Sequence, residues 1–138
     1  MAAWQQVGEC LWARVYLFGS NPLNTLAVAI RDGGLMILSP GTNVPEADFA
    51  ELDGLGKVVA LVSPGSFHNM GLAAWHARYP DSRLFGPDSA IKHIAKAHKS
   101  LAALEPLSAL APLLTDDVKV VEMPDARHPD VFVSVQRS

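Results

Sequence analysis

The chain has little cysteine, no long apolar run and no large excess of either charge, and each shortage excludes a class of protein. Cys10 is the only cysteine among 138 residues, so no intrachain disulfide can form and a reducing compartment such as the cytoplasm is expected. No stretch reaches the roughly 20 apolar residues that cross a bilayer, and the first residues lack the pattern of a signal peptide. The formal net charge of -3 gives no electrostatic basis for binding nucleic acid or an anionic membrane.

Apolar residues, in contrast, are plentiful. They make up 49% of the chain, against 18% charged residues, which is typical of a folded protein with a real core. No linker, repeat or low-complexity tract interrupts the sequence. The whole chain, residues 1–138, is therefore predicted to be a single domain.

The order of local patterns predicts a hairpin followed by alternating helices and strands. Asp32-Gly33 is typical of a tight turn with positive φ, so strands over 23–30 and 35–38 should pair antiparallel. The other expected elements are strands over 10–18, 57–62, 82–85, 118–123 and 131–135, helices after Pro45, near Asn69 and after Asp88, and short helical turns over 100–114. This order implies an α/β (α+β) fold, in which helices pack on a mixed β-sheet.

The first helix has the clearest start and inner face. Pro45 suits the first helical position, with Asn43 upstream as a cap. Phe49, Leu52 and Leu55 recur at helical spacing, so they are expected to face the core.

The most informative segment, residues 63–71, connects the strand over 57–62 to the next helix. Polar side chains gather at the carboxyl ends of strands in α/β proteins, and this segment contains Ser66, His68 and Asn69. His68 fits either of two roles. It could order the turn, or it could join its polar neighbours as a ligand-binding set or a general base.

Three segments carry a resemblance to the metallo-β-lactamase fold superfamily. Residues 35–41 look like the early strand that ends in an aspartate-containing turn. Residues 59–71 look like the strand and turn that carry the His-X-His-X-Asp-His signature, and residues 79–87 look like the proline-terminated helix and short strand that follow. The resemblance implies about one half of the family's four-layer αββα sandwich, with its second sheet face left open.

The resemblance also implies a degraded metal site. Pro64 and Ser66 stand where the signature has its first two histidines, His68 at its aspartate and Asn69 at its last histidine, while Ser39 stands at the early aspartate and His128 near a later family histidine. Zinc hydrolases need about three nitrogen, sulfur or carboxylate ligands, and only His68 and His128 offer such atoms at these positions. No cofactor is therefore expected, and zinc held by His68 and His128 is the alternative.

The sequence leaves three functions open, and it does not decide whether the chain is an enzyme. The leading hypothesis is a metallo-β-lactamase-like protein without the standard dinuclear zinc site. The alternative is a hydrolase whose catalytic residues come from Ser66, His68, Asn69 and His128, in a rebuilt site around the two histidines that a second chain completes. The third is an interaction domain that docks another protein on its open sheet. A homodimer that covers this sheet is the expected partner.

Overall fold

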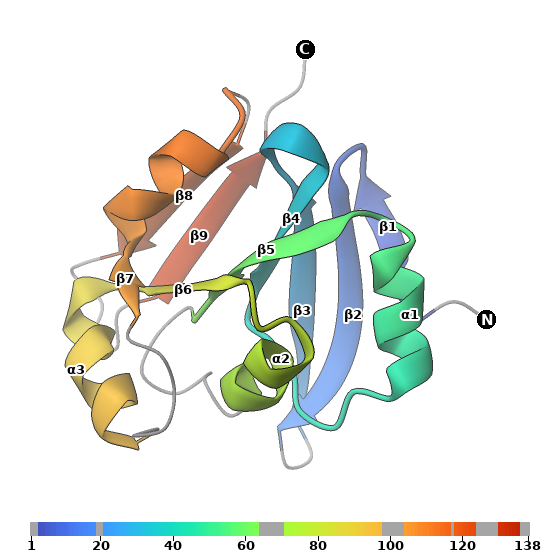
Figure 1. The fold of residues 1–138 in the computed structure, drawn as a ribbon, viewed down its shortest axis with the longest axis horizontal. Coiled ribbons are helices and arrows are strands. Elements are labelled where there is room, and N and C mark those ends of the chain that lie inside the picture. Colours follow the sequence, from blue (N-terminus) through green and yellow to red (C-terminus); the bar gives the residue numbers. More distant parts are fainter. Residues whose placement is uncertain are drawn as a thin grey trace.

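The computed structural model describes residues 3–18, 21–63, 71–97, 104–116, 118–123 and 130–135. Their main feature is a seven-stranded sheet in which spatial order follows chain order (Figure 1). Its strands are β1 (Gln5–Gly8), β2 (Leu11–Phe18), β3 (Asn21–Ala29), β4 (Gly34–Leu38), β5 (Lys57–Val62), β6 (Arg83–Gly86) and β7 (Glu105–Pro106). Strands β1 to β4 pair antiparallel, and β4 to β7 pair parallel. The prediction of a mixed sheet is confirmed.

The turn between β3 and β4 has the predicted chemistry. Asp32 and Gly33 have φ values of 59° and 74°, and they lie in a short 3₁₀ turn, Arg31–Gly33. Positive φ at two successive residues reverses the chain within a tight turn. The flanking strands pair antiparallel, with Ala29 opposite Leu35.

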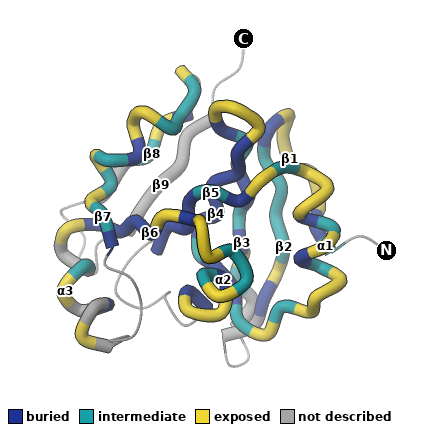
Figure 2. The backbone as a smooth tube through the Cα atoms, viewed as in Figure 1, coloured by how far each residue is buried: buried dark blue, intermediate teal, exposed yellow. Residues whose placement is uncertain are grey.

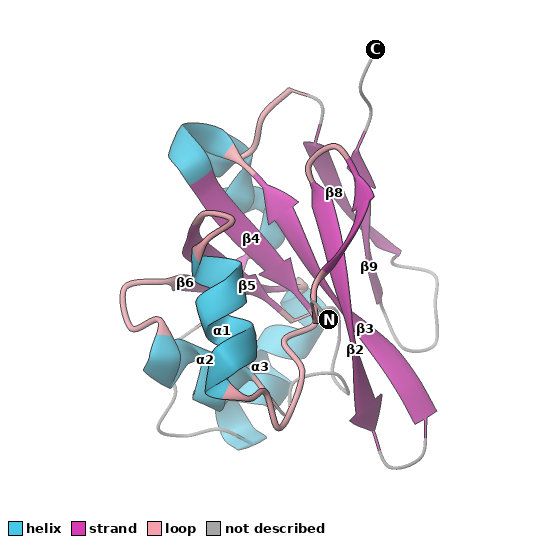
Figure 3. Ribbon diagram, turned by 90° about the vertical axis from the view of Figure 1, so that its right-hand side faces the viewer, coloured by secondary structure: helices cyan, strands magenta, loops and turns pink. Residues whose placement is uncertain are grey.

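Three helices cover one face of the sheet (Figure 3). They are α1 (Glu46–Asp53), α2 (Leu72–Arg78) and α3 (Asp88–Ala97). Alternate strand residues such as Leu35 and Ile37 point to this face. The core there also contains Phe49 and Leu52 of α1, Leu72 and Trp75 of α2, and Ile94 of α3.

The other face carries a second core. Met36 and Leu38, which alternate with the residues of the first core, belong to this cluster. It is covered by the 3₁₀ segment η2 (Leu107–Leu113) and by the antiparallel pair β8 (Val118–Met123) and β9 (Asp130–Val135). Figure 3 places β8 and β9 on the side of the sheet away from the helices. The central strands β4, β5 and β6 are therefore buried for most of their length (Figure 2).

Several local details differ from the sequence expectation. Asn43 does not cap α1: it has a φ of 56°, and Pro45 is the N-cap residue with no side-chain hydrogen bond. Leu55 does not face the core, because it follows the end of α1 and is 37% exposed. Cys10 is buried, as a packed thiol should be, but it lies in the turn before β2. Among the described residues, no helix combines the length and apolar character needed to span a membrane.

Candidate functional site

The candidate site lies at the carboxyl edge of the parallel strands, where a serine follows each of two neighbouring strands. Ser39 follows β4, and its backbone N–H donates a 3.0 Å hydrogen bond to the Val62 carbonyl oxygen. Ser63 follows β5, and its N–H donates to the Phe85 carbonyl oxygen at 2.9 Å. These bonds extend the ladders by one residue and place the two serines beside each other.

Ser39 has a strained backbone that polar side chains hold in place. Its φ is 58°, and a non-glycine residue in such a region costs about 1–3 kcal/mol. Its Oγ lies 2.8 Å from the Tyr16 hydroxyl, and its carbonyl oxygen accepts a 2.7 Å hydrogen bond from Thr25 Oγ1. Tyr16 and Thr25 are themselves 7% and 0% exposed. The turn after β4 is therefore fixed to β2 and β3 by two buried hydroxyl groups.

The same turn is in close contact with the start of α2. The Trp75 indole Nε1 donates a 2.9 Å hydrogen bond to the Gly41 carbonyl oxygen. A Cβ on Gly41 would lie 2.7 Å from the Tyr16 ring, and a Cβ on Gly71 would overlap the carbonyl oxygens of Pro40 and Gly41. A larger residue would displace buried side chains at the first position and backbone at the second, so only glycine fits at either without a shift of its neighbours.

An ion pair lies on β2 beside this network. The Arg14 guanidinium bonds the Asp48 carboxylate at 2.8 Å through Nη2 and at 2.9 Å through Nε. Both side chains are largely buried, with 11% and 19% exposed. The Arg14 Nη1 is buried and has no acceptor among the residues that the structure describes, which is uncommon for a charged donor. Arg14 and Tyr16 are two residues apart on the strand, so both side chains point to the helix-covered face.

The four predicted site residues lie outside the described residues. Ser66, His68 and Asn69 fall in 64–70, and His128 falls in 124–129. Their roles stay predictions. The structure does describe both ends of the first segment: β5 and Ser63 precede it, and Gly71 follows it. The helix expected to start near Asn69 is described from Leu72 onward.

The described edge offers hydroxyl groups where the resemblance implies a carboxylate. Ser39, at the early aspartate position, has a neutral Oγ that already bonds the Tyr16 hydroxyl. Zinc binds nitrogen, thiolate and carboxylate atoms in proteins, so the Ser39 hydroxyl is not a typical zinc ligand. No group of three or more His, Cys, Asp or Glu residues in the described ranges is placed to hold a metal ion.

The sequence identified Ser39 but not its partners. Tyr16 lies 23 residues away along the chain and Thr25 lies 14 away. The sequence did contain one sign that β2 takes part in the site. Arg14 and Tyr16 place polar groups on the face of β2 that also carries the apolar Trp12. The pairing of these groups depends on the register of β2, β3 and β4, which local patterns do not specify.

The described residues have the fold of the metallo-β-lactamases. DIM-1 metallo-β-lactamase superposes with a TM-score of 0.60 at 18% identity, over 96% of this chain and 64% of its own. The mono-zinc form of FIM-1 from Pseudomonas aeruginosa superposes with a TM-score of 0.61 at 14% identity, over 95% of this chain and 63% of its own. The chain thus spans less than two thirds of either structure. No family model and no curated protein sequence matches it.

Proposed function

We propose that this chain is a metallo-β-lactamase-like protein that lacks the standard dinuclear zinc hydrolase site and acts as a binding or assembly module. The observation that carries this proposal is the 2.8 Å contact between the Tyr16 hydroxyl and Ser39 Oγ. It gives a neutral, hydrogen-bonded pair at the position that the resemblance matches to the family's early aspartate.

Ligand chemistry extends the same argument along the motif. Proline has no side-chain atom that can bind zinc, and serine and asparagine are poor zinc ligands. Pro64, Ser66 and Asn69 therefore add little to the affinity for zinc. Structural zinc in small peptides contributes roughly 10–16 kcal/mol with a full ligand set. A set reduced to His68 and His128 should lose most of this free energy.

Metal analysis of the purified chain tests the proposal. The protein is expressed in zinc-supplemented medium, dialysed, and measured by plasma mass spectrometry beside DIM-1 prepared in the same way. We expect well below one zinc per chain here and bound zinc in DIM-1. Tightly held zinc or iron at one ion per chain would overturn the proposal. Loss of that ion in His68→Ala or His128→Ala would instead locate a rebuilt metal site at these histidines, as the hydrolase alternative requires.

A homodimer is the partner we propose, formed through the β1 end of the sheet. Val7 and Val15 are 56% and 60% exposed on the face away from the helices. A cavity of about 520 Å³ beside them is lined only by uncharged residues. Among the described strands, β1 pairs with β2 alone, so its outer edge is open. Two copies related by a two-fold axis would bring uncharged surfaces together without repulsion between like charges.

Light scattering after size exclusion measures the oligomeric state directly. The wild-type chain is expected to be a dimer, and Val15→Lys with Val7→Lys is expected to be a monomer. Leu55→Lys adds a lysine at an exposed apolar residue elsewhere, so it serves as the control and should stay dimeric. A wild-type monomer at working concentration, or a dimer unaffected by both lysines, would exclude this interface.

The cytoplasm is the compartment we propose. Cys10 is the only cysteine in the sequence, and the buried thiol is free in the folded chain. Reducing compartments keep such thiols reduced. Fractionation of cells that express the tagged chain measures its location, and recovery outside the cytoplasmic fraction would exclude the assignment.

A further inference from the structure

A cavity of about 440 Å³ lies at the opposite end of β5 from the candidate site. It is bordered by Asp53 at the end of α1, Lys57 and Val58 at the start of β5, and the segment from Arg78, the last residue of α2, to Asp81. Its volume is within the range of pockets that bind small molecules. The six residues of β5 separate it from the carboxyl edge by about 20 Å.

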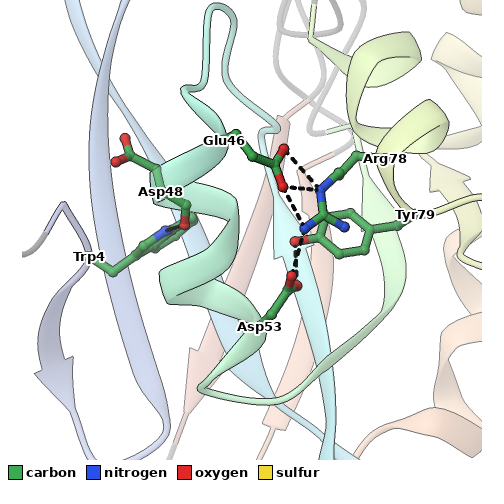
Figure 4. Close-up of polar contacts among 6 residues, drawn as sticks. All are labelled: Trp4, Glu46, Asp48, Asp53, Arg78 and Tyr79. Carbon is green, nitrogen blue, oxygen red and sulfur yellow. Dashed lines mark hydrogen bonds and ion pairs between the residues drawn. The ribbon is translucent and has the colours of Figure 1, made fainter.

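Along one wall of this cavity the charges are already paired with each other. The Arg78 guanidinium bonds Asp53 at 2.7 Å and Glu46 at 2.9 Å. The Tyr79 hydroxyl donates to the other Asp53 oxygen at 2.8 Å. Figure 4 shows these four side chains converging between α1 and the end of α2. Burial, and then the hydrogen bond to Asp53, raise the pKa of Tyr79 well above its usual range, so this hydroxyl stays a donor.

Two other charges at the cavity are available. Lys57 and Asp81 both line it, both are exposed, and they have opposite signs. Within the described parts of the chain they form no ion pair, with each other or with a third residue. The cavity therefore offers one free ammonium group and one free carboxylate on the same rim.

We propose that this cavity binds a free α-amino acid with an apolar side chain. The ligand carboxylate pairs with Lys57 and the ligand ammonium with Asp81, and its side chain lies against Val58, Tyr79 and Pro80. A purely anionic ligand would leave Asp81 unpaired, and a purely cationic one would leave Lys57 unpaired. A zwitterion satisfies both charges at once, since each forms a charge-assisted hydrogen bond. This site is independent of zinc and of the proposed dimer.

Ligands that each lack one charge test the assignment. The full chain is titrated at neutral pH by NMR with L-leucine, with 4-methylpentanoate, which has no ammonium, and with 3-methylbutylamine, which has no carboxylate. L-leucine should give saturable shifts at residues around the cavity, and each analogue should bind at least about tenfold more weakly, equivalent to ~1.4 kcal/mol.

Variants then locate the site. Asp81→Asn and Lys57→Gln should each weaken L-leucine binding by about tenfold or more. Lys119→Gln removes an exposed lysine on β8, away from the cavity, and should leave the affinity for L-leucine unchanged. The proposal is overturned by absence of saturable shifts with L-leucine, by an analogue that binds equally well, or by unchanged affinity in both cavity variants. Neither the metal analysis nor the oligomeric state affects this outcome.

Discussion

The Trp75 indole Nε1 donates a 2.9 Å hydrogen bond to the Gly41 carbonyl oxygen, which joins α2 to the turn after β4. Trp75 is fully buried, and its ring packs edge-on against Phe49 with the centroids 4.9 Å apart. One side chain therefore connects the helix layer, the sheet edge and α1. This arrangement sets the position of α2 relative to the candidate site.

Trp75→Phe should be strongly destabilising. It removes the hydrogen bond, leaves the Gly41 carbonyl oxygen without this donor, and opens a cavity beside Phe49. We expect the free energy of unfolding to fall by about 2–4 kcal/mol in chemical denaturation. Trp12→Phe is the control, because Trp12 is only half-buried, and its loss should be clearly smaller. Equal losses would show that the bond to Gly41 adds little.

Gly71→Ala should distort the junction before α2. The added Cβ overlaps the carbonyl oxygens of Pro40 and Gly41, so the backbone has to move, at a cost of about 1–3 kcal/mol. Gly8→Ala is the matched control, since a Cβ there lies 3.5 Å from Leu11 Cβ in ordinary contact. Urea denaturation of both variants measures the difference. A Gly71→Ala protein as stable as Gly8→Ala would contradict the close approach.

A double-mutant cycle should detect coupling between Tyr16 and Ser39. Tyr16→Phe and Ser39→Ala each remove one hydroxyl of the 2.8 Å pair, so the double variant should lose less than the sum of the single losses. The expected coupling is about 0.5–1.5 kcal/mol. Ser82→Ala provides the comparison, because Ser82 Oγ bonds Tyr79 and not Tyr16. Its effect should simply add to that of Tyr16→Phe.

Stability should depend on pH through the Arg83–Glu105 pair. Two hydrogen bonds of 2.8 and 2.7 Å from Arg83 lower the pKa of Glu105. The pKa of Glu105 is lower in the folded chain than in the unfolded chain. The pair therefore stabilises the fold at pH values above the usual glutamate pKa, and this stabilisation is lost as the pH falls through the pKa of the folded chain. An NMR pH titration of the Glu105 carboxyl carbon measures this pKa. Arg83→Gln should return it toward the ordinary range, and an unchanged midpoint would exclude Arg83 as the cause.

Much of the fold could be predicted, because the relevant signals are local. The Asp32-Gly33 turn and the apolar run over 57–62 predict β4 and β5 closely, since turn chemistry and buried strands leave marks within a few residues. Strand β1 was not predicted: its four residues are all exposed and show no alternation. Strand β7 has only two residues, too few for any periodicity.

The candidate site was less accessible to sequence reasoning. The resemblance identified Ser39, but its bonds to Tyr16 and Thr25 exist only once three strands are in register. The positive φ of Ser39 also has no marker in the sequence, because serine is uncommon in this region. A local pattern can therefore indicate where a strand ends and leave open which side chains meet there.

Each strand of the large sheet pairs with the strand that is synthesised just before it, which favours folding in the order of synthesis. The antiparallel pairings from β1 to β4 close short loops, which form quickly and at low entropic cost, and each parallel pairing from β4 to β7 needs a longer crossover that contains a helix. The sheet can therefore grow outward from the β3–β4 hairpin, one strand at a time, while the ribosome is still extending the chain.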